Sequence, residues 1–235
     1  MIEVPREYRD YSDYIGSEWK QFHERPERAA ASLKVTENIE VRRVLDIGCG
    51  SGQEMLPFVE RGALGFGMDV AREVGLVGRK LFVERGFGER VSFLCGSGNE
   101  IPFADASFDV IICRGALMFM DNQKALAEMS RVLRPGGVFL LRVLAPLYYW
   151  GKIKEGIRIR HYKSSIHALR VLAAGEWYLL TGRQSFSSLT AGGEIFRTSK
   201  SLSRDLERVG LKIVREMPDT EASGPSFLVT KNASK

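Results

Sequence analysis

The chain has 235 residues, of which 44% are hydrophobic and 27% charged; these proportions exclude a disordered or collagen-like chain and are typical of a globular domain. Its three cysteines are odd in number and lack metal-binding spacing, so neither a disulfide framework nor a metal site is predicted. The N-terminal residues are charged and lack an apolar core, so no signal peptide is expected. The longest apolar stretch, residues 138–150, is too short to cross a bilayer. We therefore expect a cytoplasmic protein.

The N-terminal segment predicts an amphipathic helix. Its aromatic and apolar residues recur at steps of three and four, which places them on one helical face: Tyr8, Tyr11, Ile15, Trp19 and Phe22. A second helix is expected over residues 26–33. The aromatic face either packs against the main domain or covers a ligand, and the pattern leaves both roles open.

A glycine-rich turn follows the first predicted strand. Residues 44–47 form an apolar run with the length of a buried parallel strand, and Gly48, Gly50 and Gly52 follow it before a helix predicted over residues 53–60. This order brings backbone against a nucleotide-like ligand, because glycine has no side chain to collide with it. A dinucleotide-binding turn needs a glycine where Gln53 stands, so NAD(P) is disfavoured.

The second predicted strand, residues 64–70, carries an acid near its end. Asp69 lies 23 residues beyond Asp46, and nucleotide-binding α/β folds use an acid at this place to accept hydrogen bonds from ribose hydroxyls. Its alternative role is to cap the following helix, which is expected to run to Glu84.

The remaining elements continue the alternation of strand and helix. Strands are expected over residues 91–95, 108–113, 138–144, 211–215 and 227–230. One helix begins after Asp121 and ends before Pro135, and another covers residues 201–209. Such an alternation predicts an α/β fold around a parallel sheet.

Three motifs carry a resemblance to a known family. Asp46 and the three glycines that follow it resemble motif I of the class I S-adenosylmethionine-dependent methyltransferases. Residues 96–109, with Ile101-Pro102-Phe103 and Ser107-Phe108-Asp109, are similar to the ubiquinone-biosynthesis-like (type 11) small-molecule methyltransferases, and residues 128–137 match a third motif of that superfamily. The resemblance extends over about residues 42–144.

This resemblance implies a fold and a division of the chain. The expected fold is a Rossmann-like, doubly wound, mostly parallel sheet of seven strands in the order 3-2-1-4-5-7-6, with the last strand antiparallel and a helical insertion after strand five. The chain is expected to be one methyltransferase domain, residues 1–235. Its parts are an N-terminal helical lid (1–40), a cofactor-binding core (41–145), a substrate-capping insertion (146–198) and a C-terminal helix with closing strands (199–235).

The resemblance also implies S-adenosylmethionine as the cofactor and S-adenosylhomocysteine as its product. The residues that it places at the cofactor are Asp46, Gly48, Gly50, Gly52, Asp69, Val70, Ser97, Gly98, Asn99 and Arg114. Ser97 stands where the family usually has an acid that faces the adenine amino group. Arg114 is expected to lie near the carboxylate of the cofactor or near a substrate.

The insertion is strongly basic. Nine Lys and Arg residues and three Glu residues lie between residues 146 and 200, which gives this segment a net charge of +6. A helix over residues 157–173 is expected to bury Ile159, Tyr162, Ile166 and Leu169 and to expose Arg160, Lys163, His167 and Arg170. The basic face is either simply solvated or attracts an anionic substrate or a lipid headgroup. Nucleic acid ranks lower, because no long basic stripe occurs elsewhere.

The resemblance implies methyl transfer to a small molecule, and the basic insertion indicates that this molecule is anionic or amphipathic. His161 and His167 are the candidates for a general base, if the acceptor must lose a proton. An NAD(P)-dependent oxidoreductase and a non-catalytic binding subunit with the same fold are the alternatives. The acceptor and the oligomeric state are left open.

Overall fold

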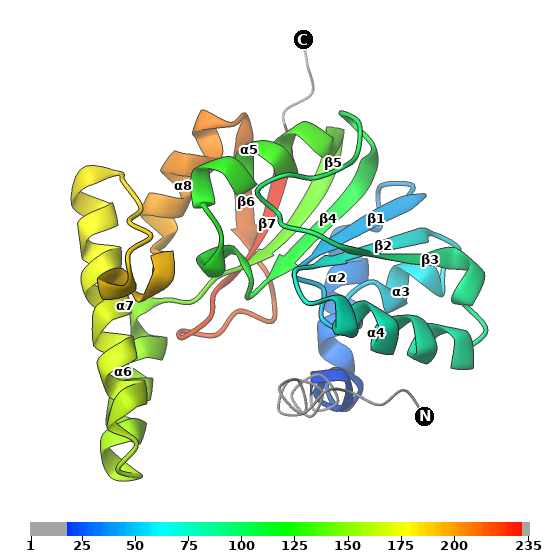
Figure 1. Ribbon diagram of the computed structural model, residues 1–235. Coiled ribbons are helices and arrows are strands. Elements are labelled where there is room, and N and C mark those ends of the chain that lie inside the picture. Colours follow the sequence, from blue (N-terminus) through cyan, green and yellow to red (C-terminus); the bar gives the residue numbers. More distant parts are fainter. Residues whose placement is uncertain (1–17, 232–235) are drawn as a thin grey trace.

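The computed structural model describes residues 18–231, without the side chains of residues 188–190. Its centre is a seven-stranded sheet with the order β3-β2-β1-β4-β5-β7-β6 (Figure 1). The strands are β1 (Arg43–Ile47), β2 (Leu64–Asp69), β3 (Val91–Cys95), β4 (Phe108–Arg114), β5 (Leu133–Arg142), β6 (Leu211–Glu216) and β7 (Ser226–Lys231). Neighbours among β1–β5 pair in parallel, whereas β7 is antiparallel to both β5 and β6. The predicted order and directions are confirmed.

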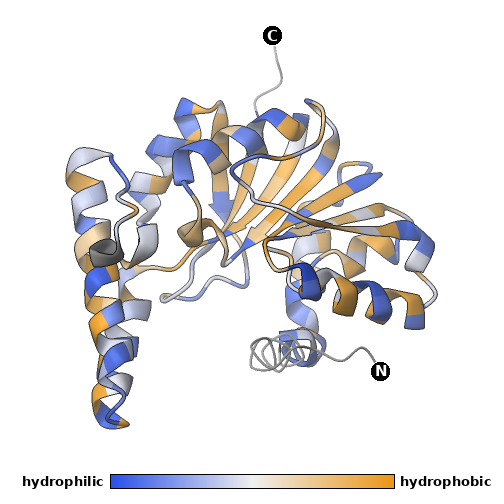
Figure 2. Ribbon diagram, in the orientation of Figure 1, coloured by the Kyte–Doolittle hydropathy of each residue, from blue (hydrophilic) through white to orange (hydrophobic). Residues whose placement is uncertain are grey.

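Helices cover both faces of the sheet. They are α2 (Pro26–Val35), α3 (Leu56–Val59), α4 (Arg72–Glu84), α5 (Asn122–Val132), α6 (Pro146–Arg158), α7 (Tyr162–Thr181) and α8 (Ser199–Arg208), with short 3-10 segments η2 (Gly88–Arg90), η3 (Leu117–Phe119) and η4 (Ser188–Gly193). Residues of α5 and α8 pack on one face, and residues of α3 and α4 pack on the other. Because both faces are buried, the central strands are almost continuously apolar (Figure 2).

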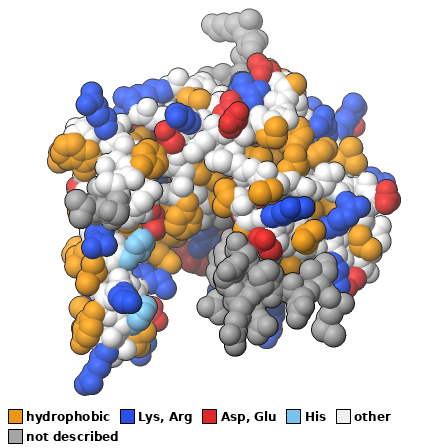
Figure 3. All heavy atoms as spheres, viewed as in Figure 1, with side chains coloured by type: hydrophobic (Ala, Val, Ile, Leu, Met, Phe, Trp, Pro, Cys, Tyr) orange, Lys and Arg blue, Asp and Glu red, His pale blue; other side chains and the backbone are white. Residues whose placement is uncertain are grey.

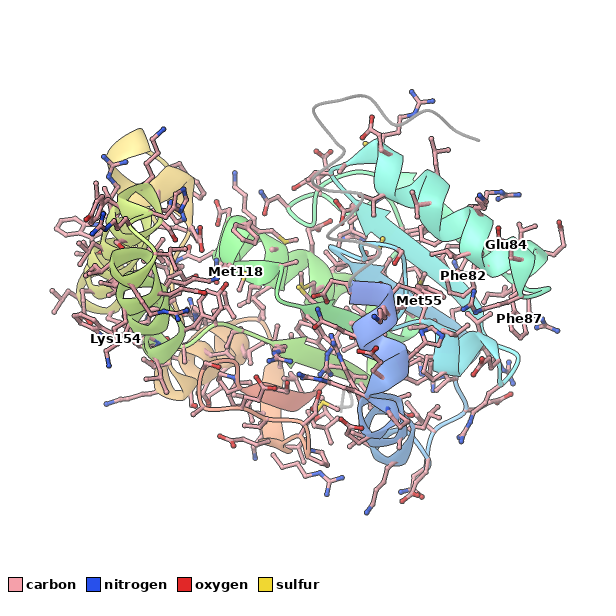
Figure 4. The ribbon with its side chains drawn as sticks, turned by 90° about the horizontal axis from the view of Figure 1, so that it is seen from below. Met55, Phe82, Glu84, Phe87, Met118 and Lys154 are labelled. Atoms are coloured by element: carbon pink, nitrogen blue, oxygen red, sulfur yellow. The ribbon has the colours of Figure 1, made fainter. Side chains whose placement is uncertain are left out.

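Alternation along β1 shows how one strand serves both cores. Leu45 and Ile47 belong to the cluster with α5 and α8, whereas Val44 belongs to the cluster with α3 and α4, as the two-residue period of a strand requires. Met55 and Phe82 come from the chain segments on that second face, where Figure 4 shows them on the same side of the sheet.

Two predicted boundaries in the core are wrong. The helix expected over residues 53–60 is only α3, because the amides of Gly52, Met55 and Leu56 each bond to a carbonyl three residues earlier and form successive turns. Strand β5 begins at Leu133 rather than at residue 138, since Leu133 pairs with Phe108 before a register shift in β4.

The insertion also differs from its prediction. The single helix expected over residues 157–173 is a hairpin of two helices, α6 and α7, which stands beside the sheet (Figure 1). The turn between them includes Arg160 in a left-handed conformation, φ 56°. The four residues expected to be buried are all about half-exposed: Ile159, Tyr162, Ile166 and Leu169. The basic residues expected on the surface are exposed as predicted.

The second N-terminal helix is present as α2, and residues 18–24 are also helical. Tyr8, Tyr11 and Ile15 lie outside the described residues. Trp19 and Phe22 are buried, and the Trp19 ring meets Phe82 of α4 edge-on with centroids 5.9 Å apart. Packing against the main domain therefore accounts for Trp19. None of the helices within residues 18–231 has the length and apolar character needed to cross a membrane.

Candidate active site

A cavity of about 560 Å³ lies at the carboxyl ends of β1, β2, β3 and β4. The strand order reverses between β1 and β4, and open α/β sheets bind ligands at such a reversal. Eight of the ten residues predicted at the cofactor line this cavity together with Ala116 and Met120: Asp46, Gly48, Gly50, Asp69, Val70, Ser97, Gly98 and Arg114.

The glycine turn forms one wall, and its backbone explains the glycines. Gly48, Gly50 and Gly52 have φ of 67°, 52° and 79°, in the left-handed region that favours glycine. A Cβ on Gly48 would collide with the Ala116 side chain, and a Cβ on Gly52 would lie 2.7 Å from Met55 Cε. Gly52 therefore packs closely against Met55, whereas Gly48 and Gly50 line the cavity.

Asp69 holds the turn as well as facing the cavity. Its Oδ2 accepts a hydrogen bond from the Gly50 amide at 3.2 Å, and its Oδ1 accepts one from the Ala71 amide at 3.0 Å. Ala71 itself occupies the N-cap position of α4. The carboxylate thus links the ends of β1 and β2, and each oxygen keeps a lone pair for a further donor.

Asp46 is a buried carboxyl group beside the same turn. Its Oδ2 has no hydrogen-bond partner within the described part of the chain. Burial, followed by the negative charges of Glu54 and Asp69, raises the pKa of Asp46 well above its ordinary value. A cationic ligand in the cavity would place a positive charge beside this carboxyl group and stabilise its charged form.

Arg114 belongs to a cluster of charges that the sequence did not reveal. Its guanidinium pairs with Asp219 and lies 3.6 Å from Glu54, measured from Nε to Oε1, and Glu54 also pairs with Arg28. Burial lowers the pKa of Arg114, although Glu54 acts in the opposite direction. The cluster joins α2, the glycine turn, β4 and the connection from β6 to β7. Because these segments are far apart in the sequence, no local sequence pattern predicts the cluster.

The opposite wall is less polar. Val70 and Phe119 line the cavity and are largely exposed, at 72% and 66%. Ser97 and Gly98 also line it, but Asn99 does not; the Asn99 amide donates a hydrogen bond to Ser97 Oγ at 3.2 Å. Asn99 therefore contacts Ser97 and does not line the cavity.

The three cysteines differ in their surroundings. Cys49 and Cys113 are buried, and Cys95 is exposed at the end of β3. Burial, together with the charge of Asp46, raises the pKa of both buried thiols, to about 12 for Cys113. The buried thiols are therefore kept protonated.

The two candidate histidines lie on the hairpin and do not line the cavity. His161 is exposed at the start of α7. His167 Nε2 lies 2.8 Å from Glu194 Oε2, and the other oxygen of Glu194 accepts a hydrogen bond from the Tyr149 hydroxyl at 2.8 Å. This arrangement gives His167 a structural partner away from the cavity.

Gln184 connects the insertion to the cavity wall, and sequence reasoning missed it. Its Nε2 donates to the carbonyl oxygens of Met120 and Gly193, at 2.7 and 2.6 Å, and its Oε1 accepts from the Asn122 amide at 2.9 Å. Met120 lines the cavity. A lone glutamine after a helix carries no sequence signal for such a contact.

Comparison with known proteins identifies the core. Residues 45–141 match the model of a family described as a methyltransferase domain. These residues are a class I S-adenosylmethionine-dependent methyltransferase domain. The methyltransferase domain contains the glycine turn, Asp69, Ser97 and Arg114, so it accounts for most of the cavity.

Curated relatives match about half of this chain. Sterol 4-C-methyltransferase strm-1 of Caenorhabditis elegans is 32% identical over 139 residues, which are 59% of this chain and 40% of that protein. The uncharacterized methyltransferase YcgJ of Bacillus subtilis is 40% identical over 110 residues, 46% of this chain and 43% of that protein. The matched part of this chain thus spans about two fifths of these relatives.

Solved structures share the fold over most of the chain. A methyltransferase of Thermotoga maritima, described as a possible histamine N-methyltransferase, has a TM-score of 0.59 at 17% identity and covers 94% of this chain and 96% of its own. The cyclase SpnF has a TM-score of 0.62 at 17% identity, covering 88% and 81%. Because one neighbour is a [4+2]-cyclase, the fold alone does not define the reaction.

The residues of the methyltransferase domain suit S-adenosylmethionine, which carries an ammonium group, a sulfonium centre and a carboxylate. The cavity is lined by the acids Glu18, Asp46, Glu54 and Asp69 and by the bases Arg28 and Arg114. Asp46, with its unpartnered buried oxygen, suits the cationic end, and the free lone pairs of Asp69 suit ribose hydroxyls. Nothing in the match or in the donor set favours NAD(P).

Proposed function

We propose that the protein transfers a methyl group from S-adenosylmethionine to a small, amphipathic molecule and releases S-adenosylhomocysteine. The observation that carries this proposal is the cavity in the methyltransferase domain, which has acids at the glycine turn and exposed apolar residues, Phe119 among them, on its other wall. Relatives named for sterol and demethylmenaquinone methylation support an acceptor with a large apolar part.

When bound, the cofactor supplies a methyl group on a positively charged sulfur, which leaves as a neutral thioether. Transfer of this methyl group to the acceptor atom would leave the electron pair of the broken bond on sulfur. The protein has to hold the two reactants in contact, and correct positioning can itself supply a large part of the rate. Asp69 and Asp46 would hold the cofactor, and Phe119 and Met120 would form the apolar wall for the acceptor.

The insertion is suited to cap the acceptor. Helix α6 begins four residues after β5 ends, and β5 runs parallel to β4, so the hairpin stands at the edge of the sheet where the cavity opens (Figure 1). Gln184 then fixes the end of the insertion to Met120 in the cavity wall. We place acceptor recognition between this insertion and the methyltransferase domain.

The test uses purified protein, S-adenosylmethionine labelled on its methyl group, and an extract of the source cells divided into lipid, small-molecule, RNA and protein fractions. Label in the lipid or small-molecule fraction supports the proposal and defines the acceptor. Label in RNA or protein contradicts the proposed acceptor class. Binding of S-adenosylhomocysteine without any transferred label would instead indicate a binding subunit.

Ser97 offers a graded test of the cofactor's position. Ser97→Asp is expected to increase the affinity for S-adenosylhomocysteine by about three- to tenfold, because a carboxylate accepts a stronger hydrogen bond from the adenine amino group than a hydroxyl does. Calorimetric titration measures the change. Ser92→Asp, at an exposed position of β3, the strand that precedes Ser97, is the matched control and should leave the affinity unchanged. An unchanged or lower affinity for Ser97→Asp would place the adenine elsewhere.

A further inference from the structure

Helix α7 is apolar on two opposite faces. One face packs inward through mostly small residues: Ser165, Ala168, Val171, Ala174, Gly175 and Tyr178. The other face is an outer stripe of Tyr162, Ile166, Leu169, Ala173, Trp177 and Leu180, all of them exposed. The five large residues of the outer stripe have exposed fractions between 49% and 83%. A helix that only covers a core shows one apolar face, so the outer stripe has no role in the fold of the described residues.

The outer stripe forms one continuous line. Its residues follow one another at steps of four, three, four, four and three, which is the spacing of a single helical face. At 1.5 Å per residue, the 18 steps from Tyr162 to Leu180 extend over about 27 Å. Helix α6 adds three further exposed apolar residues, Leu147, Trp150 and Ile157. Figure 3 shows hydrophobic side chains gathered along the outer edge of the hairpin. An apolar surface of this extent marks an interaction site.

The hairpin is also basic. Residues 146–181 contain six Lys and Arg residues and two Glu residues, a net charge of +4. Lys163 and Arg170 follow Tyr162 and Leu169 directly, so they flank one side of the outer stripe. Lys152 pairs with Glu155 at 3.7 Å, and the other five basic residues make no ion pair within residues 18–231. Figure 4 shows Lys154 on the side of α6 that faces away from the sheet.

We propose that the outer stripe of α7 and its flanking basic residues dock onto an anionic lipid surface. An amphipathic helix with Leu, Ile and Trp on one face and Lys and Arg beside it lies in the headgroup region of such a surface. Tyr162 and Trp177 suit this position, because their rings have an apolar body and a polar group. Anionic headgroups neutralise the unpaired cations, whereas a second copy of the hairpin would bring charges of the same sign together.

This docking goes beyond the proposed methyl transfer and does not depend on it. The test is co-sedimentation of the full chain with vesicles of phosphatidylcholine alone and of equal parts phosphatidylcholine and phosphatidylglycerol. Binding is expected to the anionic vesicles and to weaken as salt is added, since ions screen the attraction. Equal binding to both kinds of vesicle, or to neither, would overturn the proposal.

Two double variants test the apolar residues of the outer stripe and its flanking basic residues separately. Ile166→Ser with Leu169→Ser, and Lys163→Glu with Arg170→Glu, are each expected to reduce binding to anionic vesicles by about tenfold or more. Leu76→Ser with Arg79→Glu is the matched control on exposed positions of α4 and should bind as the parent does. Circular dichroism and S-adenosylhomocysteine titration show that each variant is folded, so lost vesicle binding is distinguishable from a failed cofactor site.

Sedimentation velocity over a range of protein concentrations tests whether a second copy of the chain, rather than a lipid surface, covers the outer stripe. A monomer that binds anionic vesicles supports the proposal. A dimer that Ile166→Ser with Leu169→Ser dissociates, in a protein that does not bind vesicles, overturns it in favour of a second copy of the chain.

Discussion

Asp69→Ala is expected to weaken S-adenosylhomocysteine binding by about 10- to 100-fold. Hydrogen bonds to a charged acceptor contribute about 1.5–3 kcal/mol, and each 1.4 kcal/mol changes an affinity tenfold. The substitution removes the acceptor that we propose for the ribose hydroxyls, and it also releases the amides of Gly50 and Ala71 that now bond to this carboxylate. Both effects act on the same wall of the cavity. Calorimetric titration of the purified variant measures the loss.

Two further variants make this result specific. Asp69→Asn retains an oxygen acceptor without the charge and should fall between the parent and Asp69→Ala. Glu89→Ala removes an exposed acid from η2 that does not line the cavity, and it should leave the affinity unchanged. Native affinity for Asp69→Ala in a folded protein would contradict the assignment of the ribose to this carboxylate.

Asp205→Ala is expected to reduce the free energy of unfolding by about 3–5 kcal/mol, because it leaves the charge of Arg197 buried without its partner. Arg197 is 1% exposed, and its Nη2 lies 2.5 Å from Asp205 Oδ2. The Tyr178 hydroxyl donates to the same oxygen at 2.7 Å, so the carboxylate joins α7 to α8. Urea unfolding followed by circular dichroism measures the change.

The control for this variant lies on the same helix. Glu207→Ala removes an exposed acid that bonds only to Ser203 among the described side chains, and it should change the free energy of unfolding by less than about 1 kcal/mol. Replacement of both Arg197 and Asp205 by leucine should recover much of the stability, because neither charge is then left unpaired. A loss for Asp205→Ala no larger than that of Glu207→Ala would contradict a stabilising role for the network.

The same carboxylate makes stability depend on pH. Burial acts to raise the pKa of Asp205, but hydrogen bonds from Tyr178 and Arg197 and the charge of Arg197 outweigh it and hold the pKa below its ordinary value. The charged form is therefore favoured in the folded state. Its stabilising contribution is complete above the pKa of the unfolded chain, about 3.9, and is lost as pH falls through the lower folded value. In Asp205→Ala this acid-dependent part should disappear.

The sheet was predictable because its signals are local. Apolar runs mark the buried strands, and the turn after β1 requires glycine at Gly48, Gly50 and Gly52 for reasons of backbone conformation. The resemblance then supplied the strand order. In contrast, the ion pairs of Arg114 with Glu54 and Asp219, and that of Arg28 with Glu54, form only after four separated segments have folded together. No residue spacing within the sequence predicts these ion pairs.

The face of α7 was mispredicted for a different reason. Hydrophobicity favoured burial of Ile166 and Leu169, but close approach of the two hairpin helices needs small residues instead. A Cβ on Gly156 would collide with Ser165 Oγ, and one on Gly175 would collide with the ring of Phe196. Small residues therefore pack inward and large apolar ones remain outside. Periodicity locates the two faces of such a helix, and only the neighbouring elements decide which of them is covered.

The distribution of thiols makes the native chain suitable for selective labelling. Reaction with a maleimide requires a thiolate that the reagent can reach. Cys49 lines the cavity, but its thiol and that of Cys113 are buried, and burial raises the pKa of each thiol. Cys95 is exposed and directly precedes Gly96 and Ser97, which line the cavity. A fluorophore attached there would sit at the rim of the cavity and report its occupancy without any engineered cysteine.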